Sequence, residues 1–436
     1  MMHIRPGRRA AALAAIGAAS LVLAACSDSG ADSGSGEEST EFTYWSMWKE
    51  GEPMQVVMAQ AIEDFEAETG ITVDAQWQGR DNVQRTVPTL STRTGPDLVD
   101  GSYVKLFPAI VASGQALGLD EAWTAESEGG TLEEVVPARY LETIDIELED
   151  GQPWMVPYTI TSDAVWFDAA SHPDLVESPP QTWDDFIGLL DSLEADGQTP
   201  IALDGDIPGY NAYWFTTLLL RNSGPGSLHA IAADETGESW KDPAVLDAAE
   251  KVQQLVDGGY FVDGYDASKF PTHQQEWAAG DAALLFMGTW APMETQTYAS
   301  EGFDFASMPF PLTSGDHNSA RADFNGFVVP RNADNADAAQ KFAAFYLQEK
   351  YQALAAEGGQ LPVREDVEPP AEQAGVWAHL QEADSFHQQN DGVAFPGYND
   401  KVFWAINDEL VLGKIDAQEF VDKMAAATAE YWAEQG

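Results

Sequence analysis

The sequence predicts an α/β protein with at least two sheets flanked by helices. Strand and helix patterns alternate in two separate stretches, 42–75 and 182–203. The chain has 436 residues, 44% of them hydrophobic, which is enough for large cores. At roughly 100–200 residues per domain, this length predicts two or three domains.

The first stretch begins with Phe42-Thr43-Tyr44-Trp45, whose alternation predicts a strand. Apolar residues then recur at helical spacing until Gly70: Met54, Val57, Met58, Ala61, Ile62 and Phe65. Strand alternation returns at 71–75. A strand, a helix and a strand in about 35 residues form a βαβ unit, which predicts parallel pairing.

The second stretch begins at Thr182 and Asp185, which have the spacing of a capping box. Its helix should end at Gly197, before a short buried strand at 201–203. Later segments predict a helix from Asp242-Pro243 to Gly258, a strand at 283–287, a helix around 342–346 and a last helix from about Asp416.

The N-terminus has the pattern of a secretory signal, with Arg5, Arg8 and Arg9 before an apolar run at 10–25. Leu23-Ala24-Ala25-Cys26 resembles the lipobox of bacterial lipoproteins, which implies that Cys26 is lipidated and holds the protein on the extracellular face of the membrane. The alternative is an ordinary signal peptide or short membrane anchor with an incidental cysteine. We expect a signal peptide at 1–25 and a flexible tether at 26–40, which is rich in Ser, Gly, Asp and Glu.

Composition excludes several partners. Seventy-two acidic and 21 basic residues give a net charge of −51, which disfavours nucleic acid and anionic lipid surfaces. With a single cysteine, the body of the protein has no internal disulfide and no thiolate metal site. The 14 Trp and 13 Tyr residues weakly favour a protein that handles sugars.

Several motifs occur in a telling order: 61–73 (AIEDFEAETGITV), Gly95-Pro96-Asp97, 182–186 (TWDDF), 280–290 (GDAALLFMGTW), 327–330 (FVVP) and 361–364 (LPVR). In this order and spacing they resemble the extracellular solute-binding proteins of carbohydrate ABC importers, the family that includes maltose-binding protein. The resemblance extends from about Phe42 to Trp432.

The resemblance implies two lobes, each a mostly parallel sheet flanked by helices, with a sugar held in the cleft between them. Lobe 1 would comprise 41–157 plus about 304–348, and lobe 2 would comprise 158–303 plus about 349–436. The crossings would lie near 156–161, 303–310 and 346–352. It also implies a monomer that closes by hinge motion and delivers its sugar to a membrane permease, without a cofactor, a metal or chemistry of its own.

A sugar ring needs flat aromatic side chains for its C–H face and polar groups for its hydroxyls. The candidate ligand-binding residues, at strand ends, loops and crossings, are Trp48, Asp100, Tyr158, Asp163, Tyr210, Trp214, Trp290, Asn325, Gly326, Arg364 and Tyr398. Trp404 is a weaker candidate. Some of these residues could instead have structural roles. The alternatives are core packing for Trp214 and Trp290, a surface charge for Asp163, and a salt bridge from Arg364 to Glu365 or Asp366.

Two rival functions remain: a secreted glycoside hydrolase, because paired carboxylates and aromatics suit one, and a solute-binding protein for another solute such as a glycerol phosphate. No Gly-x-Ser-x-Gly or His-Glu-x-x-His motif is present. His273, His379 and His387 lack metal-ligand spacing, and we expect them at the surface. Among sugars, the number of aromatic candidates favours an oligosaccharide.

Overall fold

The computed structural model describes residues 40–92, 94–126, 129–144 and 146–435. The predicted signal peptide, Cys26 and tether residues 27–39 lie outside this range. None of the helices in the described range is long and apolar enough to cross a membrane.

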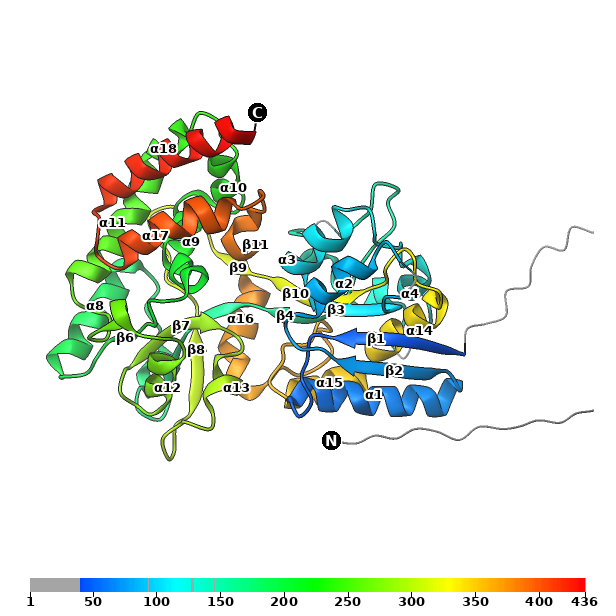
Figure 1. Ribbon diagram of the computed structural model, residues 1–436. Helices are drawn as coiled ribbons and strands as arrows, with labels where there is room; N and C mark the ends of the chain where they lie inside the picture. Colours follow the sequence, from blue (N-terminus) through cyan, green and yellow to red (C-terminus); the bar gives the residue numbers. More distant parts are fainter. Residues whose placement is uncertain (1–39, 93, 127–128, 145, 436) are drawn as a thin grey trace, which may run out of the picture. The chain divides into compact units, whose positions relative to one another are not determined.

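Five strands of the described residues form one sheet in the order β2-β1-β3-β10-β4 (Figure 1). Their bounds are β1 Glu41–Ser46, β2 Thr72–Trp77, β3 Leu98–Ser102, β4 Val156–Thr161 and β10 Asp323–Val328. β1 is parallel to β2 and β3, so the predicted βαβ unit is confirmed. β10 runs antiparallel to both of its neighbours. We call this sheet with its helices lobe 1.

A second sheet within the described residues has four strands in the order β6-β7-β5-β8. Their bounds are β5 Asp163–Asp168, β6 Ile201–Ala202, β7 Leu284–Gly288 and β8 Phe305–Met308. β6 and β7 are parallel, whereas β5 is antiparallel to β7 and β8. We call this sheet with its helices lobe 2. Two further short strands, β9 (Ser319–Arg321) and β11 (Ser385–His387), pair with each other in parallel and form a separate small sheet.

The α/β class and the helix-flanked sheets are confirmed, but both sheets are mixed rather than mostly parallel. The reason is the route of the chain. β5 follows β4 directly from lobe 1, and β10 follows β9 from the lobe 2 side, so neither strand arrives through the crossover helix that makes neighbours parallel.

Helices cover both sheets. Those of lobe 1 are α1 Pro53–Thr69, α2 Asn82–Thr86, α3 Tyr103–Leu106, α4 Asp120–Thr124, α5 Leu132–Val135, α14 Ala336–Tyr346 and α15 Glu349–Glu357. The short α6 (Ala138–Leu141) follows α5. Rings from β1, α1 and α14 interlock in this core, with Phe42 and Phe65 each within 6 Å of Phe342 between ring centroids.

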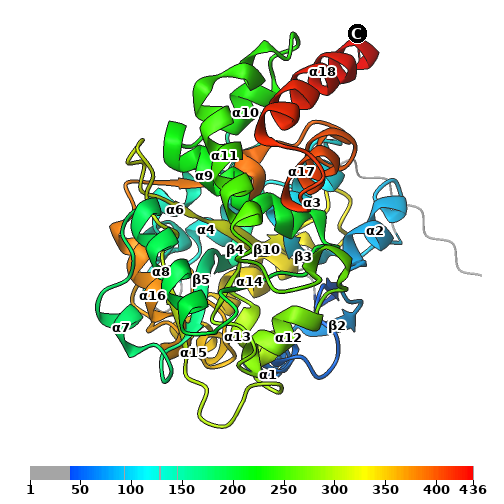
Figure 2. The same ribbon diagram turned by 90° about the vertical axis from the view of Figure 1, so that its left-hand side faces the viewer.

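The helices associated with lobe 2 are α7 Pro173–Glu177, α8 Trp183–Ala195, α9 Pro208–Ser223, α10 Ser227–Ala232, α11 Pro243–Asp257, α12 Thr272–Ala278, α13 Ala291–Thr295, α16 Ala374–Glu382, α17 Trp404–Val411 and α18 Ala417–Gln435. α18, drawn in red, packs on α11 and α17, and α9 packs on α11 (Figure 2). The capping box predicted for α8 is present: the Thr182 hydroxyl accepts a hydrogen bond from the Asp185 amide at 3.2 Å.

The crossings between the lobes differ in part from the prediction. β4 ends at Thr161 and β5 begins at Asp163, so the first passage lies at Ser162. β8, predicted in lobe 1, pairs with β5 of lobe 2, and the chain returns to lobe 1 only between β9 and β10. α15, which falls in the part of the chain predicted for lobe 2 from about residue 349, packs on α1 of lobe 1. The last passage to lobe 2 therefore falls after Leu361, which still bridges to Ile160, and before α16, which packs on β8.

Candidate functional site

A cavity of about 340 Å³ is lined by side chains of both lobes. Its lining residues are Met47, Trp48, Arg80, Ser102, Tyr103, Val104, Lys105, Thr161, Tyr210, Tyr213, Thr289, Trp290, Met293, Glu294, Arg321, Asp323, Asn325, Gln360 and Gln389. Many of these follow the ends of β1, β3, β4 and β7. In α/β folds, ligand sites commonly form at such strand ends.

Three aromatic rings of lobe 2 form one wall of the cavity. Tyr210 and Tyr213 lie on α9, and Trp290 lies between β7 and α13. The Tyr210 ring centroid is 5.7 Å from that of Tyr213 and 6.1 Å from that of Trp290. A Cβ at Gly288 would lie 2.3 Å from the Trp290 ring, so the glycine that ends β7 makes room for the indole. Tyr210 and Trp290 are therefore at the cavity, where the sequence places candidate platforms.

A buried guanidinium lies against these rings. Arg321 is 5.0 Å from the ring centroid of Tyr213 and 5.9 Å from that of Trp290. Its Nε donates to Asp323 Oδ2 at 2.6 Å, and its Nη1 lies 3.6 Å from Asp163 Oδ2. Burial lowers the pKa of Arg321, but Tyr213 and the two carboxylates more than offset this, so the pKa lies above its ordinary value. Arg321 is thus a permanent cation held by two acids.

Lobe 1 contributes a fourth large ring, Trp48, just after β1. Its Nε1 donates to the Tyr158 hydroxyl at 3.0 Å, and the Arg80 guanidinium lies 4.5 Å from its ring centroid. Asn325 of β10 lines the same side of the site. Trp48 and Asn325, both predicted ligand residues, are therefore brought to one cavity with Tyr210 and Trp290.

Asp100 and Tyr158 lie behind Trp48 and do not line the cavity. Both are fully buried. Asp100 accepts hydrogen bonds from the Met47 amide at 2.6 Å and from the Tyr158 hydroxyl at 2.8 Å. Burial raises the pKa of Asp100 to about 6, although these hydrogen bonds oppose the shift. Their contacts are with the protein, so they support the site rather than face a ligand.

Asp163 also lies outside the lining, but it is not a surface charge. It faces Arg321 from β5, and burial raises its pKa while Arg321 opposes the shift. A second acid, Glu294 of α13, does line the cavity and accepts a hydrogen bond from Gln274 Nε2 at 3.1 Å. Burial raises the pKa of Glu294 as well.

Three further candidates, Trp214, Arg364 and Tyr398, lie away from the cavity. Trp214 packs in the lobe 2 core, 5.0 Å from Phe286 between ring centroids. Arg364 forms the salt bridge considered as its alternative, with two hydrogen bonds to Asp366 at 2.8 and 2.6 Å. The Tyr398 hydroxyl is 2.6 Å from Thr428 Oγ1 in another buried cluster. These side chains are satisfied by the protein itself.

Gly326 and Trp404 also contact other parts of the protein and do not line the cavity. A Cβ at Gly326 would lie 2.5 Å from Met155 Cε and 2.6 Å from the Val156 carbonyl oxygen, so the close approach is between strands of lobe 1. Trp404 Nε1 donates to Asn390 Oδ1 at 3.4 Å and does not line the cavity. The expectation of surface histidines is wrong for His379 and His387, which are buried, and burial lowers the pKa of His379 to about 3.

The sequence reasoning missed several cavity residues, above all Arg80, Tyr103, Glu294 and Arg321. The candidates include Trp214 and not Tyr213, although both are about one helical turn from Tyr210, so helical spacing cannot choose between them. For Arg321, one feature of the sequence could have indicated a role at the site. It is one of only 21 basic residues and stands two positions from Asp323 on an apolar strand-like segment.

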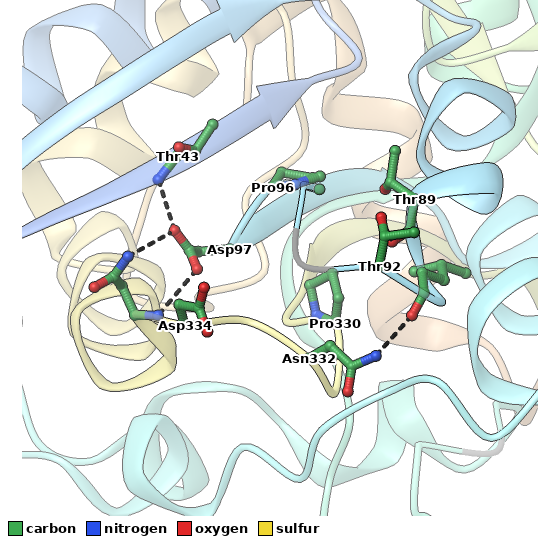
Figure 3. Close-up of a pocket in the computed structure, with 11 residues that line it drawn as sticks. Thr43, Thr89, Thr92, Pro96, Asp97, Pro330, Asn332 and Asp334 are labelled. Carbon is green, nitrogen blue, oxygen red and sulfur yellow. Dashed lines mark hydrogen bonds between the residues drawn. The ribbon is translucent and has the colours of Figure 1, made fainter.

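A smaller cavity of about 160 Å³ lies elsewhere in lobe 1, around Asp97 (Figure 3). The Asp97 carboxylate accepts from the Thr43 amide at 3.0 Å, from the Asn335 amide at 3.0 Å and from Asn335 Nδ2 at 3.2 Å. The Pro-Asp motif therefore fastens the start of β3 to β1 and to the entrance of α14, which is a structural role. In the described part of the chain, no group of three or more His, Cys, Asp and Glu side chains could hold a metal ion.

The family model for the bacterial extracellular solute-binding proteins matches residues 48–353. A "probable sugar-binding periplasmic protein" of Mesorhizobium japonicum is 28% identical over 250 residues, 56% of this chain and 57% of that protein. The "diacetylchitobiose binding protein NgcE" of Streptomyces coelicolor is 23% identical over 263 residues, 58% of this chain and 55% of that protein. The matches thus span little more than half the length of these relatives.

The fold is also found in solved structures. A "chitin oligosaccharide binding protein" superposes with a TM-score of 0.69 at 22% identity, covering 91% of this chain and 99% of the other. At this identity the likeness shows the fold.

Proposed function

Because the chain belongs to the bacterial extracellular solute-binding proteins, we propose that it is a receptor that binds a sugar in the cavity between its two lobes and delivers it to an ABC permease. The observation that carries the proposal is the cavity lining. Aromatic rings from both lobes, Trp48 on one side and Tyr210, Tyr213 and Trp290 on the other, surround a space rich in amides, hydroxyls and charged groups.

This lining has the chemistry that a sugar requires. Aromatic faces stack on the C–H face of a pyranose, and side chains such as Asn325, Gln360 and Gln389 offer donors and acceptors to its hydroxyls. An oligosaccharide is the favoured ligand because several rings line one cavity. The names of relatives that bind diacetylchitobiose or chitin oligosaccharides agree with this choice.

The remaining parts of the proposal concern the cell. Lipidation of Cys26 would hold the protein on the extracellular face of the membrane, and residues 27–40 would tether its body. The lobes would close around the sugar through the connecting segments, and closure would be the signal to the permease. We propose that the protein acts as a monomer and without catalysis.

A thermal-shift screen of the chain from residue 27 onward tests the proposal. A sugar that binds only the folded state raises Tm, by an amount that corresponds to about 2.7 kcal/mol at a hundredfold excess over Kd. The panel contains mono-, di- and trisaccharides, including diacetylchitobiose, and a glycerol phosphate. A shift with the glycerol phosphate alone would contradict the sugar assignment, and release of smaller sugars during incubation would favour a hydrolase.

The variant Trp290→Ala tests the site itself. Losing a stacking face of roughly 50 Å² removes about 1 kcal/mol, so Kd for the sugar should rise about fivefold. Tyr298→Ala is the matched control, because Tyr298 is 49% exposed and does not line the cavity. Equal binding by both variants would place the sugar elsewhere.

A further inference from the structure

A line of buried hydrogen bonds connects Asp100 to the cavity wall. Trp48 Nε1 donates to the Tyr158 hydroxyl at 3.0 Å, and this hydroxyl donates to Asp100 Oδ2 at 2.8 Å. Asp100 and Tyr158 have no exposed surface, and Trp48 alone of the three lines the cavity. Among these three side chains, the Asp100 carboxylate is therefore linked to the cavity through Trp48.

The direction of the protons makes this connection specific. Tyr158 has a single hydroxyl proton, and an ionised Asp100 can only accept, so that proton points to Asp100. The lone pairs of Tyr158 are then left for Trp48 Nε1, which can only donate. One protonation state of Asp100 thus sets the orientation of the hydroxyl that holds the indole.

Asp100 also holds the backbone that leads into Trp48. Its Oδ1 accepts from the Met47 amide at 2.6 Å, and its Oδ2 lies 3.4 Å from Ser46 Oγ, which donates to it. Ser46 Oγ in turn accepts from the Trp48 amide at 3.2 Å and from the Tyr44 hydroxyl at 3.1 Å. Both the ring and the main chain of Trp48 are therefore positioned from the same carboxylate.

We infer that Asp100 is a positioning residue of the proposed sugar site: in its ionised form it holds Trp48 against the cavity through Tyr158 and Ser46, and its protonation loosens this hold and weakens sugar binding. The effect on sugar binding rests on the proposed function. The hold of Asp100 on Tyr158 and Trp48 does not depend on it.

The surroundings of Asp100 permit such a switch near pH 6. The groups that face it are Tyr44 and Ser46 on β1, Tyr158 on β4 and Tyr346 on α14, and in the described range no cationic side chain forms a salt bridge with it. Burial raises the pKa of Asp100 to about 6, so this carboxylate can change its protonation state there. Burial also raises the pKa of each of the three tyrosines above its ordinary value of 10, so the tyrosines keep their protons at that pH. A protonated Asp100 can donate, and Tyr158 is then no longer required to point its proton toward it.

Stability and binding should respond to acid in opposite directions. The folded-state pKa of Asp100 is raised above its ordinary value of 3.8, so the stability that its protonation contributes is fully present below about pH 4 and is lost as the pH rises through about 6. Weaker binding in acid cannot then be ascribed to unfolding caused by Asp100.

The first test observes the Trp48 indole N–H by NMR in the ligand-free protein, with its signal identified by its loss in Trp48→Phe. We expect this signal to titrate with a midpoint of about pH 6. The titration should disappear in Asp100→Asn, and the signal should shift in Tyr158→Phe, which keeps the ring that packs on Phe327. Asp391→Asn is the matched control, because burial also raises the pKa of Asp391 to about 6 while its carboxylate bonds to Gly226 and Leu228 amides.

Three results would overturn the inference: a titration that persists in Asp100→Asn, one that disappears in Asp391→Asn, or a Trp48 signal that Tyr158→Phe leaves unchanged. Because Tyr158→Phe retains the buried ring, it supplies the answer if Asp100→Asn does not fold.

The second test measures Kd for diacetylchitobiose at about pH 5 and about pH 7.5, either side of the Asp100 pKa. We expect binding to weaken severalfold in acid, and Asp100→Asn to bind weakly at both values. A wild-type affinity that does not change with pH would overturn the positioning role. If no sugar in the panel binds while the indole titrates, the proposed function fails and the arrangement around Trp48 stands.

Discussion

Arg321 illustrates how a single side chain combines binding and stability at this site. It is 4% exposed, touches two aromatic rings of the cavity wall, and neutralises Asp323, which is buried, and Asp163, whose side chain is 12% exposed. A buried charge without its partner is far more costly than a surface charge without its partner.

Replacing Arg321 by Met should therefore reduce the free energy of unfolding by about 3–5 kcal/mol, because the buried Asp323 and the largely covered Asp163 lose their cation. Urea unfolding followed by circular dichroism measures the change. Arg80→Met is the control: the Arg80 side chain is 42% exposed and pairs with a partly exposed Glu52, so its loss should cost less than about 1 kcal/mol. Similar costs for the two variants would show that Arg321 does not carry a buried charge network.

Among the elements, β10 shows why a glycine can be essential inside a strand. The strand is fully buried and has a register shift between Asn325 and Gly326, where it pairs with β4. This irregularity sets the position of Asn325 at the cavity, so the small residue beside it serves both packing and the site.

Gly326→Ala should destabilise the protein by about 1–3 kcal/mol, because the new Cβ meets Met155 and the Val156 carbonyl at 2.5 and 2.6 Å. Gly188→Ala provides the opposite case. Gly188 lies exposed within α8 with nothing within 4 Å of its added Cβ, so the substitution should stabilise by about 0.5–1 kcal/mol. Thermal unfolding of both variants measures the two signs, and a loss in both would mean that the gain in helix propensity is overridden.

For the molecule as a whole, the dominant feature is its net charge of −51. Such an excess makes the folded chain repel itself, and salt shortens the range of this repulsion from roughly 30 Å at 0.01 M to about 8 Å at 0.15 M. The charge thus opposes the folded state most strongly at low ionic strength.

Tm should accordingly rise by a few degrees between about 0.01 M and 0.15 M NaCl. Calorimetry in NaCl and in KCl provides the measurement and its control, because screening depends on ionic strength and not on the identity of the cation. A rise that occurs with one salt only would indicate a specific ion site, and no rise would mean that the acids are too dispersed to repel.

The candidate site could be predicted only in part. Trp48, Tyr210 and Trp290 line the cavity because each stands close to the start or end of a strand or helix, which the sequence pattern reveals, whereas Asn325 lies inside β10 beside its register shift. Trp214 and Tyr398 have the same residue types in similar places, yet each contacts a neighbour that is distant in the chain, and Arg364 instead pairs with Asp366 two residues away.

The order of strands and helices, the α/β class and the family follow from the chain's local patterns, because periodicity, caps and motifs act over a few residues. The sheet partners of β8, the antiparallel entry of β5 and β10, and the meeting of Arg321 with Asp163 required the folded structure. Packing between segments far apart in the chain determines whether a buried side chain faces a cavity, a core or an opposite charge, and local periodicity carries no information about which distant segments meet.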